Sequence, residues 1–137
     1  MMNPDKSYIF FAETTEGYVI KALSELLQNN IKSGIFNIDK SSITFSMADS
    51  NNKMLFEIEL LANKFNKYKY KNSTPLSIGL NLLHLHKMVK QTKKKDSIAL
   101  FIEADNDSKI GVIVIPKDKN RKTIRYFPIQ NVQGLEN

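Results

Sequence analysis

The sequence predicts an α+β domain built from two β-α-β-β-β units, with antiparallel sheets and two helices on one face. Much of the 137-residue chain falls in short apolar or alternating stretches typical of strands, and only two segments repeat apolar residues with the 3.6-residue period of a helix. The order strand, helix, strand, strand, strand also occurs twice, although the two halves share few identical residues. Short strands joined by tight turns favour antiparallel pairing.

The first unit contains a helix expected near residues 17–31. Apolar residues recur there at helical spacing after Gly17, and Gly34 ends the pattern. The strands that follow alternate apolar and polar residues and are separated by turns rich in Asp, Asn and Ser. The strands expected in this unit are Ser7–Ala12, Ser33–Asp39, Ser42–Ala48 and Met54–Leu61.

The second unit repeats this order around a helix expected near residues 82–92, which has its own apolar stripe. The tail after Phe127 has no regular period, so we expect a linker or a chain end there. The strands expected in this unit are Leu76–Leu82, Ser97–Glu103, Lys109–Ile115 and Arg121–Phe127.

Residues 66–71 lie between the two units, and after Asn66 they alternate lysine with tyrosine. One interpretation is a platform on which bases of single-stranded nucleic acid stack. We favour the other interpretation, an edge strand whose tyrosines pack inward while its lysines prevent pairing with other edges.

Positive charge is concentrated in the second helix region. The net charge of +6 favours a polyanionic partner such as nucleic acid, although lysines can also serve solubility alone. Residues 82–95 hold five lysines, two histidines and no acid. His84, Lys87 and Gln91 share one face of a helical wheel, opposite the apolar stripe, and Lys90 flanks this face. Such a row can follow a phosphate backbone without reading bases, whereas a merely solvated helix face usually mixes both signs of charge.

Sequence motifs for enzymatic, cofactor or metal chemistry are not found. There is no cysteine and no glycine-rich phosphate loop. His84 and His86 would point about 200° apart on a helix, so they cannot hold one metal ion. The acidic residues within 103–107 lack the glycine and closing glutamate of a calcium loop and predict an acidic hairpin instead. We predict no enzyme, no cofactor and no metal, and no membrane partner because the apolar stretches are too short to span a bilayer.

Long stretches of the chain, from about Phe11 to Leu135, resemble proliferating cell nuclear antigen. FFAETTEGYVIKALSELLQNNIKSGIFNI is similar to that family's first strand and helix, including the glycine at the helix start. SSITFSMADSNNKMLFEIELLANKFNKYKY is similar to the segment in which an aspartate-serine turn leads into a leucine-rich strand. LSIGLNLLHLHKMVKQTKKKDSIALFIEADNDSKIGVIV is similar to the second helix and the hairpin after it.

The resemblance implies a DNA sliding clamp, in which three two-domain subunits form a ring with helices around duplex DNA and sheets outside. Lys21, Lys87 and Lys90 match positions at which the family points basic side chains at DNA. His84 and Lys93 are added to this predicted DNA-binding set from the helical wheel and not from the family.

The resemblance also implies two protein-binding surfaces. Strand 121–127 resembles the edge that pairs with the neighbouring subunit, with Ile124 and Arg125 at that interface. Other proteins would dock in a groove between the connector that joins the two domains and the end of the strand Ser42–Ala48. The residues predicted for this docking groove are Ala48, Ile129, Val132 and Leu135.

We therefore expect residues 1–127 to form the N-terminal domain of a clamp and residues 128–137 to begin the connector to a second domain that has been cut off. A half-length clamp that closes its ring with more copies is the alternative.

Expected partners are duplex DNA, DNA polymerase and other proteins with clamp-binding peptides, a clamp loader, and other clamp subunits, in replication and repair. We expect the protein in the nucleus or another site of DNA replication, such as a cytoplasmic viral factory. Two other functions stay open: a clamp-fold accessory protein that binds DNA or polymerase without a ring, and a small enzyme of unrecognised type.

Overall fold

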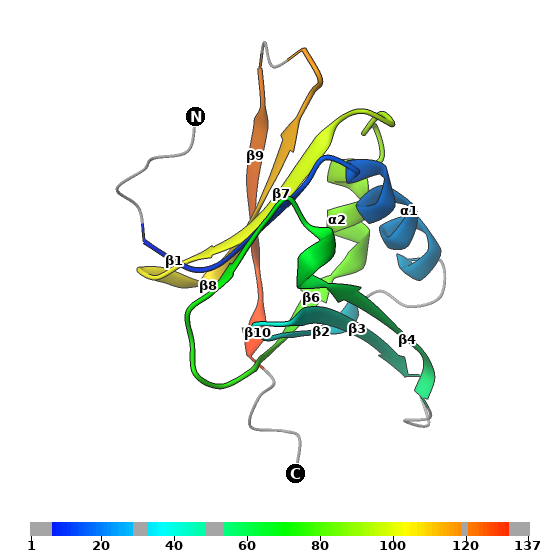
Figure 1. The fold of residues 1–137 in the computed structure, drawn as a ribbon. Helices are drawn as coiled ribbons and strands as arrows, with labels where there is room; N and C mark the ends of the chain where they lie inside the picture. Colours follow the sequence, from blue (N-terminus) through cyan, green and yellow to red (C-terminus); the bar gives the residue numbers. More distant parts are fainter. Residues whose placement is uncertain (1–6, 29–32, 49–53, 119–120, 132–137) are drawn as a thin grey trace.

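The computed structural model describes residues 7–28, 33–48, 54–118 and 121–131 (Figure 1). The helices in these ranges are α1 (Gly17–Gln28) and α2 (Leu82–Val89), with a short 3-10 helix at Ala62–Lys64. The strands are β1 (Tyr8–Thr14), β2 (Ser33–Ile38), β3 (Ser42–Ala48), β4 (Met54–Leu61), β5 (Lys67–Tyr70), β6 (Leu76–Asn81), β7 (Ser97–Glu103), β8 (Asn106–Ile115), β9 (Thr123–Pro128) and β10 (Gln130–Asn131).

Two antiparallel sheets each combine strands from both units. The first sheet has the order β5-β1-β7-β8-β9 and the second has the order β10-β6-β2-β3-β4. The opening strand of each unit lies in the sheet of the other unit, because β1 pairs with β7 and β6 pairs with β2. The two units are therefore interlocked and share one fold, as the ribbon shows (Figure 1).

The main core joins side chains from both sheets and both helices. Phe10 of β1, Phe45 of β3, Val89 of α2 and Val112 of β8 are among its fully or almost fully buried members. Burial of each such side chain stabilises the fold by about 1.5–3 kcal/mol. The helices α1 and α2 lie side by side (Figure 1), so the expected α+β class with paired helices is confirmed.

A smaller cluster lies on the opposite face of the first sheet, where Ala99, Phe101 and Ile113 are buried. Phe101 of β7 stands directly across from Gly111 of β8. A Cβ atom placed on Gly111 would lie only 2.2 Å from the ring carbon Cζ of Phe101. The glycine is needed because the phenylalanine ring fills the space that its side chain would occupy.

The lysine-tyrosine segment forms β5 at one edge of the first sheet. Its lysines are exposed, whereas Tyr68 is half-buried and Tyr70 is buried. The Tyr68 hydroxyl lies 2.6 Å from the carbonyl oxygen of Asp39 and 2.9 Å from that of Ser42, so its proton ties this edge to the β2–β3 turn of the second sheet. Burial also raises the pKa of the Tyr68 phenol. The edge-strand interpretation is confirmed.

Some strands are longer than expected because pairing continues past the apolar pattern. β1 reaches Thr14 because its last two residues still pair with β7. β8 begins at Asn106, not at Lys109, because Asn106 pairs with Glu103 across a tight turn. This pairing confirms the acidic hairpin.

Other ends also differ from the expected ones. α2 ends at Val89, not near residue 92, because the Thr92 amide donates to the Val89 carbonyl over 2.9 Å and tightens the chain into a turn. The tail has a regular element, β10, which pairs with β6; two residues are too few to show an alternating pattern. The expected end of the first helix, residues 29–31, lies outside the described residues. In the described ranges no helix is long and apolar enough to cross a membrane.

Candidate nucleic-acid interface

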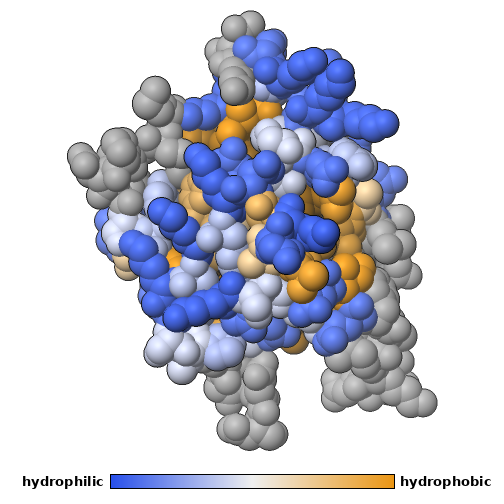
Figure 2. Space-filling model, in the orientation of Figure 1, coloured by the Kyte–Doolittle hydropathy of each residue, from blue (hydrophilic) through white to orange (hydrophobic). Residues whose placement is uncertain are grey.

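The outward face of α2 carries the basic side chains that the helical wheel placed there. Leu85 is 4% exposed and Val89 is fully buried, which fixes the apolar side of the helix against the core. His84, Lys87 and Lys90 are exposed as a result, with Lys90 in the turn directly after the helix. Figure 2 shows that hydrophilic side chains dominate one face of the molecule, with smaller apolar patches between them.

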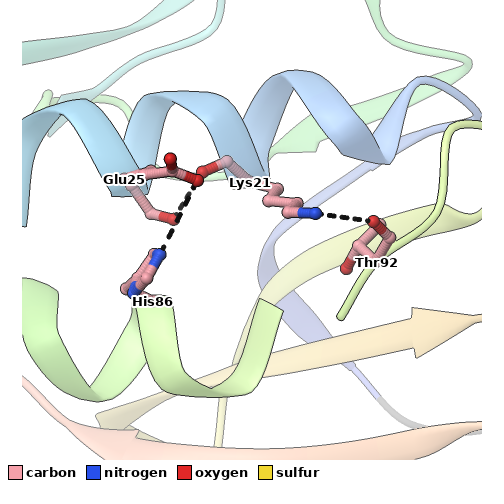
Figure 3. A network of polar contacts seen from close by, with 5 residues as sticks. Lys21, Glu25, His86 and Thr92 are labelled. Carbon is pink, nitrogen blue, oxygen red and sulfur yellow. Dashed lines mark hydrogen bonds and ion pairs between the residues drawn. The ribbon is translucent and has the colours of Figure 1, made fainter. Parts of the chain in front are cut away.

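His86 lies apart from His84 and Lys87 of the same helix. It is only partly exposed, and its Nε2 lies 3.9 Å from a carboxylate oxygen of Glu25 on α1 (Figure 3). The sequence of α2 contains no acid, but the neighbouring helix supplies one. The exposed basic side chains of α2, His84 and Lys87, therefore lie on a different side of the helix from His86.

Lys21, on α1, is bound within the fold. Its Nζ donates a hydrogen bond of 3.3 Å to the carbonyl oxygen of Thr92, in the turn that follows α2 (Figure 3). The side chain is partly buried and ties α1 to that turn. Sequence reasoning placed Lys21 toward DNA but did not foresee this contact, which joins residues 71 positions apart.

The lysine-rich turn between α2 and β7 is held by Asp96, which is 8% exposed. One carboxylate oxygen accepts from the Lys93 amide at 2.9 Å, and the other accepts from the Lys117 amide at 3.2 Å. The Asp96 carbonyl also accepts from the amide of Gly17 at the start of α1, at 3.0 Å. Lys93 is thereby positioned with an exposed side chain. Sequence reasoning missed this role of Asp96. The signal for it was an acidic residue directly after the three lysines 93–95.

Two predicted sets of residues meet in a groove of about 600 Å³ between α2 and β9. His84 and Lys87, predicted for DNA, line one side, and Arg125, predicted for a subunit interface, lines the other. Ile124 is 43% exposed and lies on the opposite face of β9, across from Ile113. The structure thus separates the two predicted interface residues onto two faces of one edge strand.

The residues predicted for partner docking are only partly described. Ala48 ends β3, opposite Met54, and Ile129 packs against the main core. In the second sheet β2 and β6 separate β3 from β10, the strand that follows Ile129. Val132 and Leu135 lie outside the described residues. Among the residues that the structure describes, no three potential ligands gather to hold a metal ion.

Residues 9–132 match the family model for proliferating cell nuclear antigen, N-terminal domain. The chain belongs to this family. Relatives of this proliferating cell nuclear antigen domain include a probable DNA polymerase sliding clamp of Autographa californica nuclear polyhedrosis virus, 27% identical over 99 residues that cover 72% of this chain and 38% of that protein. Probable DNA polymerase sliding clamp 1 of Paramecium bursaria Chlorella virus 1 is 28% identical over 133 residues, which cover 96% of this chain and 50% of that protein.

A solved structure shows the same fold. Proliferating cell nuclear antigen from Thermococcus kodakaraensis aligns with a TM-score of 0.75 at 16% identity, over 89% of this chain and 47% of that one. The domain therefore has the fold of the sliding-clamp family, and it spans half or less of the length of these relatives.

Proposed function

We propose that this proliferating cell nuclear antigen domain is part of a processivity clamp that encircles duplex DNA, and that it has no enzymatic activity. Family membership and the two viral relatives named as probable DNA polymerase sliding clamps support the assignment to sliding clamps. The observation that carries the proposal is the exposed row of His84, Lys87 and Lys90 on the side of α2 turned away from the core.

Such a row suits a protein that must hold DNA and still move along it. Ammonium groups attract phosphates without reading bases, and each contact is broken and remade by counterion exchange. In an encircling ring the topology provides retention, so the individual contacts need only be loose. Lys93 extends the row, whereas Lys21 contributes less because its ammonium already binds the Thr92 carbonyl.

We assign ring contacts to the free strand edges. β9 is the outermost strand of the first sheet and presents Ile124 and Arg125 as exposed residues. An exposed edge has unpaired backbone groups with which another strand can pair, extending the sheet.

We propose that residues 1–127 form the clamp domain, that 128–137 begin a connector, and that Ala48 with this connector receives polymerase and other clamp-binding peptides. A clamp loader would open the ring at sites of DNA replication.

Replacement of both Lys87 and Lys90 by alanine should weaken binding to duplex DNA about equally for all sequences. It should also flatten the log–log dependence of affinity on salt by roughly one unit for each phosphate that the protein no longer neutralises. Stability should change by only a few tenths of a kcal/mol, because both side chains are exposed. Fluorescence anisotropy at several salt concentrations measures the affinity and its salt dependence.

The matched control removes Lys69 and Lys71, exposed residues on and beside β5, the opposite edge of the first sheet from β9. This pair should leave the affinity nearly unchanged. A larger decrease in affinity from the control pair would move the DNA contact away from α2. It would favour the alternative of an accessory protein that binds DNA without a ring.

A further inference from the structure

The turn that follows α2 carries the end of the basic row. Lys90 and Lys93 are exposed there, on either side of Thr92, which is 4% exposed. The chain between them is tightly folded, because the Thr92 amide donates to the Val89 carbonyl over 2.9 Å. The direction in which both lysines project therefore depends on how the backbone of this turn is held.

Lys21 holds this backbone from the neighbouring helix. Its Nζ donates to the carbonyl oxygen of Thr92 over 3.3 Å, and Figure 3 shows the side chain reaching from α1 across to the turn. A hydrogen bond from an ammonium group is stronger than one between two neutral groups. The amide of Gly17 adds a second bond from the start of α1, to the carbonyl of Asp96 at 3.0 Å. The helix α1 thus holds the turn at two points.

The other charged side chain of α1 is also turned toward α2. The helix Gly17–Gln28 contains one base, Lys21, and one acid, Glu25. The Glu25 carboxylate lies 3.9 Å from Nε2 of His86, beside the Lys21 contact (Figure 3). Within the described residues of α1 only Lys21 could neutralise a phosphate, and its side chain is partly buried and already bound. The two helices therefore differ: α2 presents basic side chains to solvent, and α1 supports it.

We propose that Lys21 is a positioning residue for DNA binding, which acts through Lys90 and Lys93 instead of contacting a phosphate itself. The inference rests on the function proposed above, because it gives Lys21 a part in the DNA contact of α2. With the bond to Thr92 in place, both lysines project from a backbone that is already held. Without this bond the turn must be ordered when the duplex binds, and the cost of that ordering lowers the affinity.

The substitution Lys21→Met tests this role, because methionine keeps much of the side-chain length and removes the charge and the donors. Duplex affinity should fall about threefold, within the range measured for residues that share one network of contacts. The log–log slope of affinity against salt should stay unchanged, because the protein neutralises the same number of phosphates. In a Lys90→Ala/Lys93→Ala background the same substitution should have no measurable effect, since the residues through which it acts are gone. Fluorescence anisotropy at several salt concentrations measures all three.

Two further variants separate the hydrogen bond from the charge. Lys21→Arg should restore most of the affinity, because a guanidinium can donate to the same carbonyl. Lys69→Met removes an equal charge from β5, the edge of the first sheet opposite β9, and should leave the affinity nearly unchanged. The hold on the turn is measured without DNA: the amide resonances of Thr92 and Lys93 should shift in ¹⁵N-labelled Lys21→Met and move much less in Lys21→Arg.

A salt slope reduced by about one unit, with a loss that adds to that of Lys90→Ala/Lys93→Ala, would show that Lys21 contacts a phosphate and would overturn the inference. Unchanged duplex affinity in Lys21→Met would overturn it as well. If Lys87→Ala/Lys90→Ala still weakened binding in that case, the proposed clamp would stand and only the inference about Lys21 would be lost. If Lys87→Ala/Lys90→Ala had no effect, the proposed DNA face would be wrong, and shifted turn amides in Lys21→Met would leave Lys21 a structural contact only.

Discussion

Gly111→Ala should lower the free energy of unfolding by about 1–3 kcal/mol, the usual cost of overpacking a filled site. A Cβ at this position would lie 2.2, 2.5 and 2.6 Å from three ring carbons of Phe101. The ring has little freedom to move away. It is 2% exposed and packs edge-on against Tyr8 and Tyr126, with centroid distances of 5.4 and 5.7 Å. Urea denaturation of the purified variant measures the change in stability.

A double-mutant cycle tests whether the Phe101 ring causes the destabilisation expected for Gly111→Ala. Phe101→Ala alone should cost about 3–5 kcal/mol because it empties a buried aromatic site. In that background Gly111→Ala should be close to neutral or mildly stabilising, because the obstructing ring is gone and alanine restricts the unfolded chain. An equal destabilisation in both backgrounds would show that the glycine is required for its backbone and not for the ring.

Asp96→Ala should lower stability by about 2–3 kcal/mol, since charge-assisted hydrogen bonds contribute more than neutral ones. The variant leaves the amides of Lys93 and Lys117 without their acceptor. These amides belong to different turns, so the substitution should loosen the α2–β7 turn from the β8–β9 turn. Thermal denaturation gives the energy, and the amide shifts of the two lysines report the turns.

Asp96→Asn provides the matched comparison. The amide side chain keeps one carbonyl oxygen, so it can accept from one of the two backbone amides and should be clearly less destabilising than alanine. Lys95→Ala, an exposed neighbour, should change stability by less than about 0.5 kcal/mol. If Asp96→Ala were as mild as Lys95→Ala, the carboxylate would not hold the turn.

Much of the fold follows from local patterns. Alternation located β3 and β4 at their observed bounds, Ser42–Ala48 and Met54–Leu61, because Ile43 and Phe45 of β3 are buried and Ile58 and Leu60 of β4 are partly buried while the residues between them are more exposed. The exchange of β1 and β6 between the sheets was not predicted, because pairing partners distant in sequence leave no periodic signal. β10 was missed for a related reason: its pairing with β6, and not its two residues, defines it.

The candidate site was likewise predictable from the sequence only in part. The exposure of His84 and Lys87 follows from helical geometry and the buried Leu85/Val89 side. The contact of Lys21 with Thr92 depends on how α1 and α2 pack, which the sequence does not state. The groove that brings Arg125 opposite α2 likewise exists only once β9 has joined the first sheet.

Encirclement of DNA is tested most directly by the retention of the assembled protein on linear duplex DNA whose two ends are either open or closed by bulky protein blocks. A ring threaded before the ends are blocked should stay bound through a high-salt wash that weakens the lysine contacts, and it should slide off DNA with open ends. Equal dissociation from open and blocked DNA at high salt, with equal binding to both at low salt, would contradict encirclement. That result would assign the cations of α2 to direct binding by a protein that does not close around DNA.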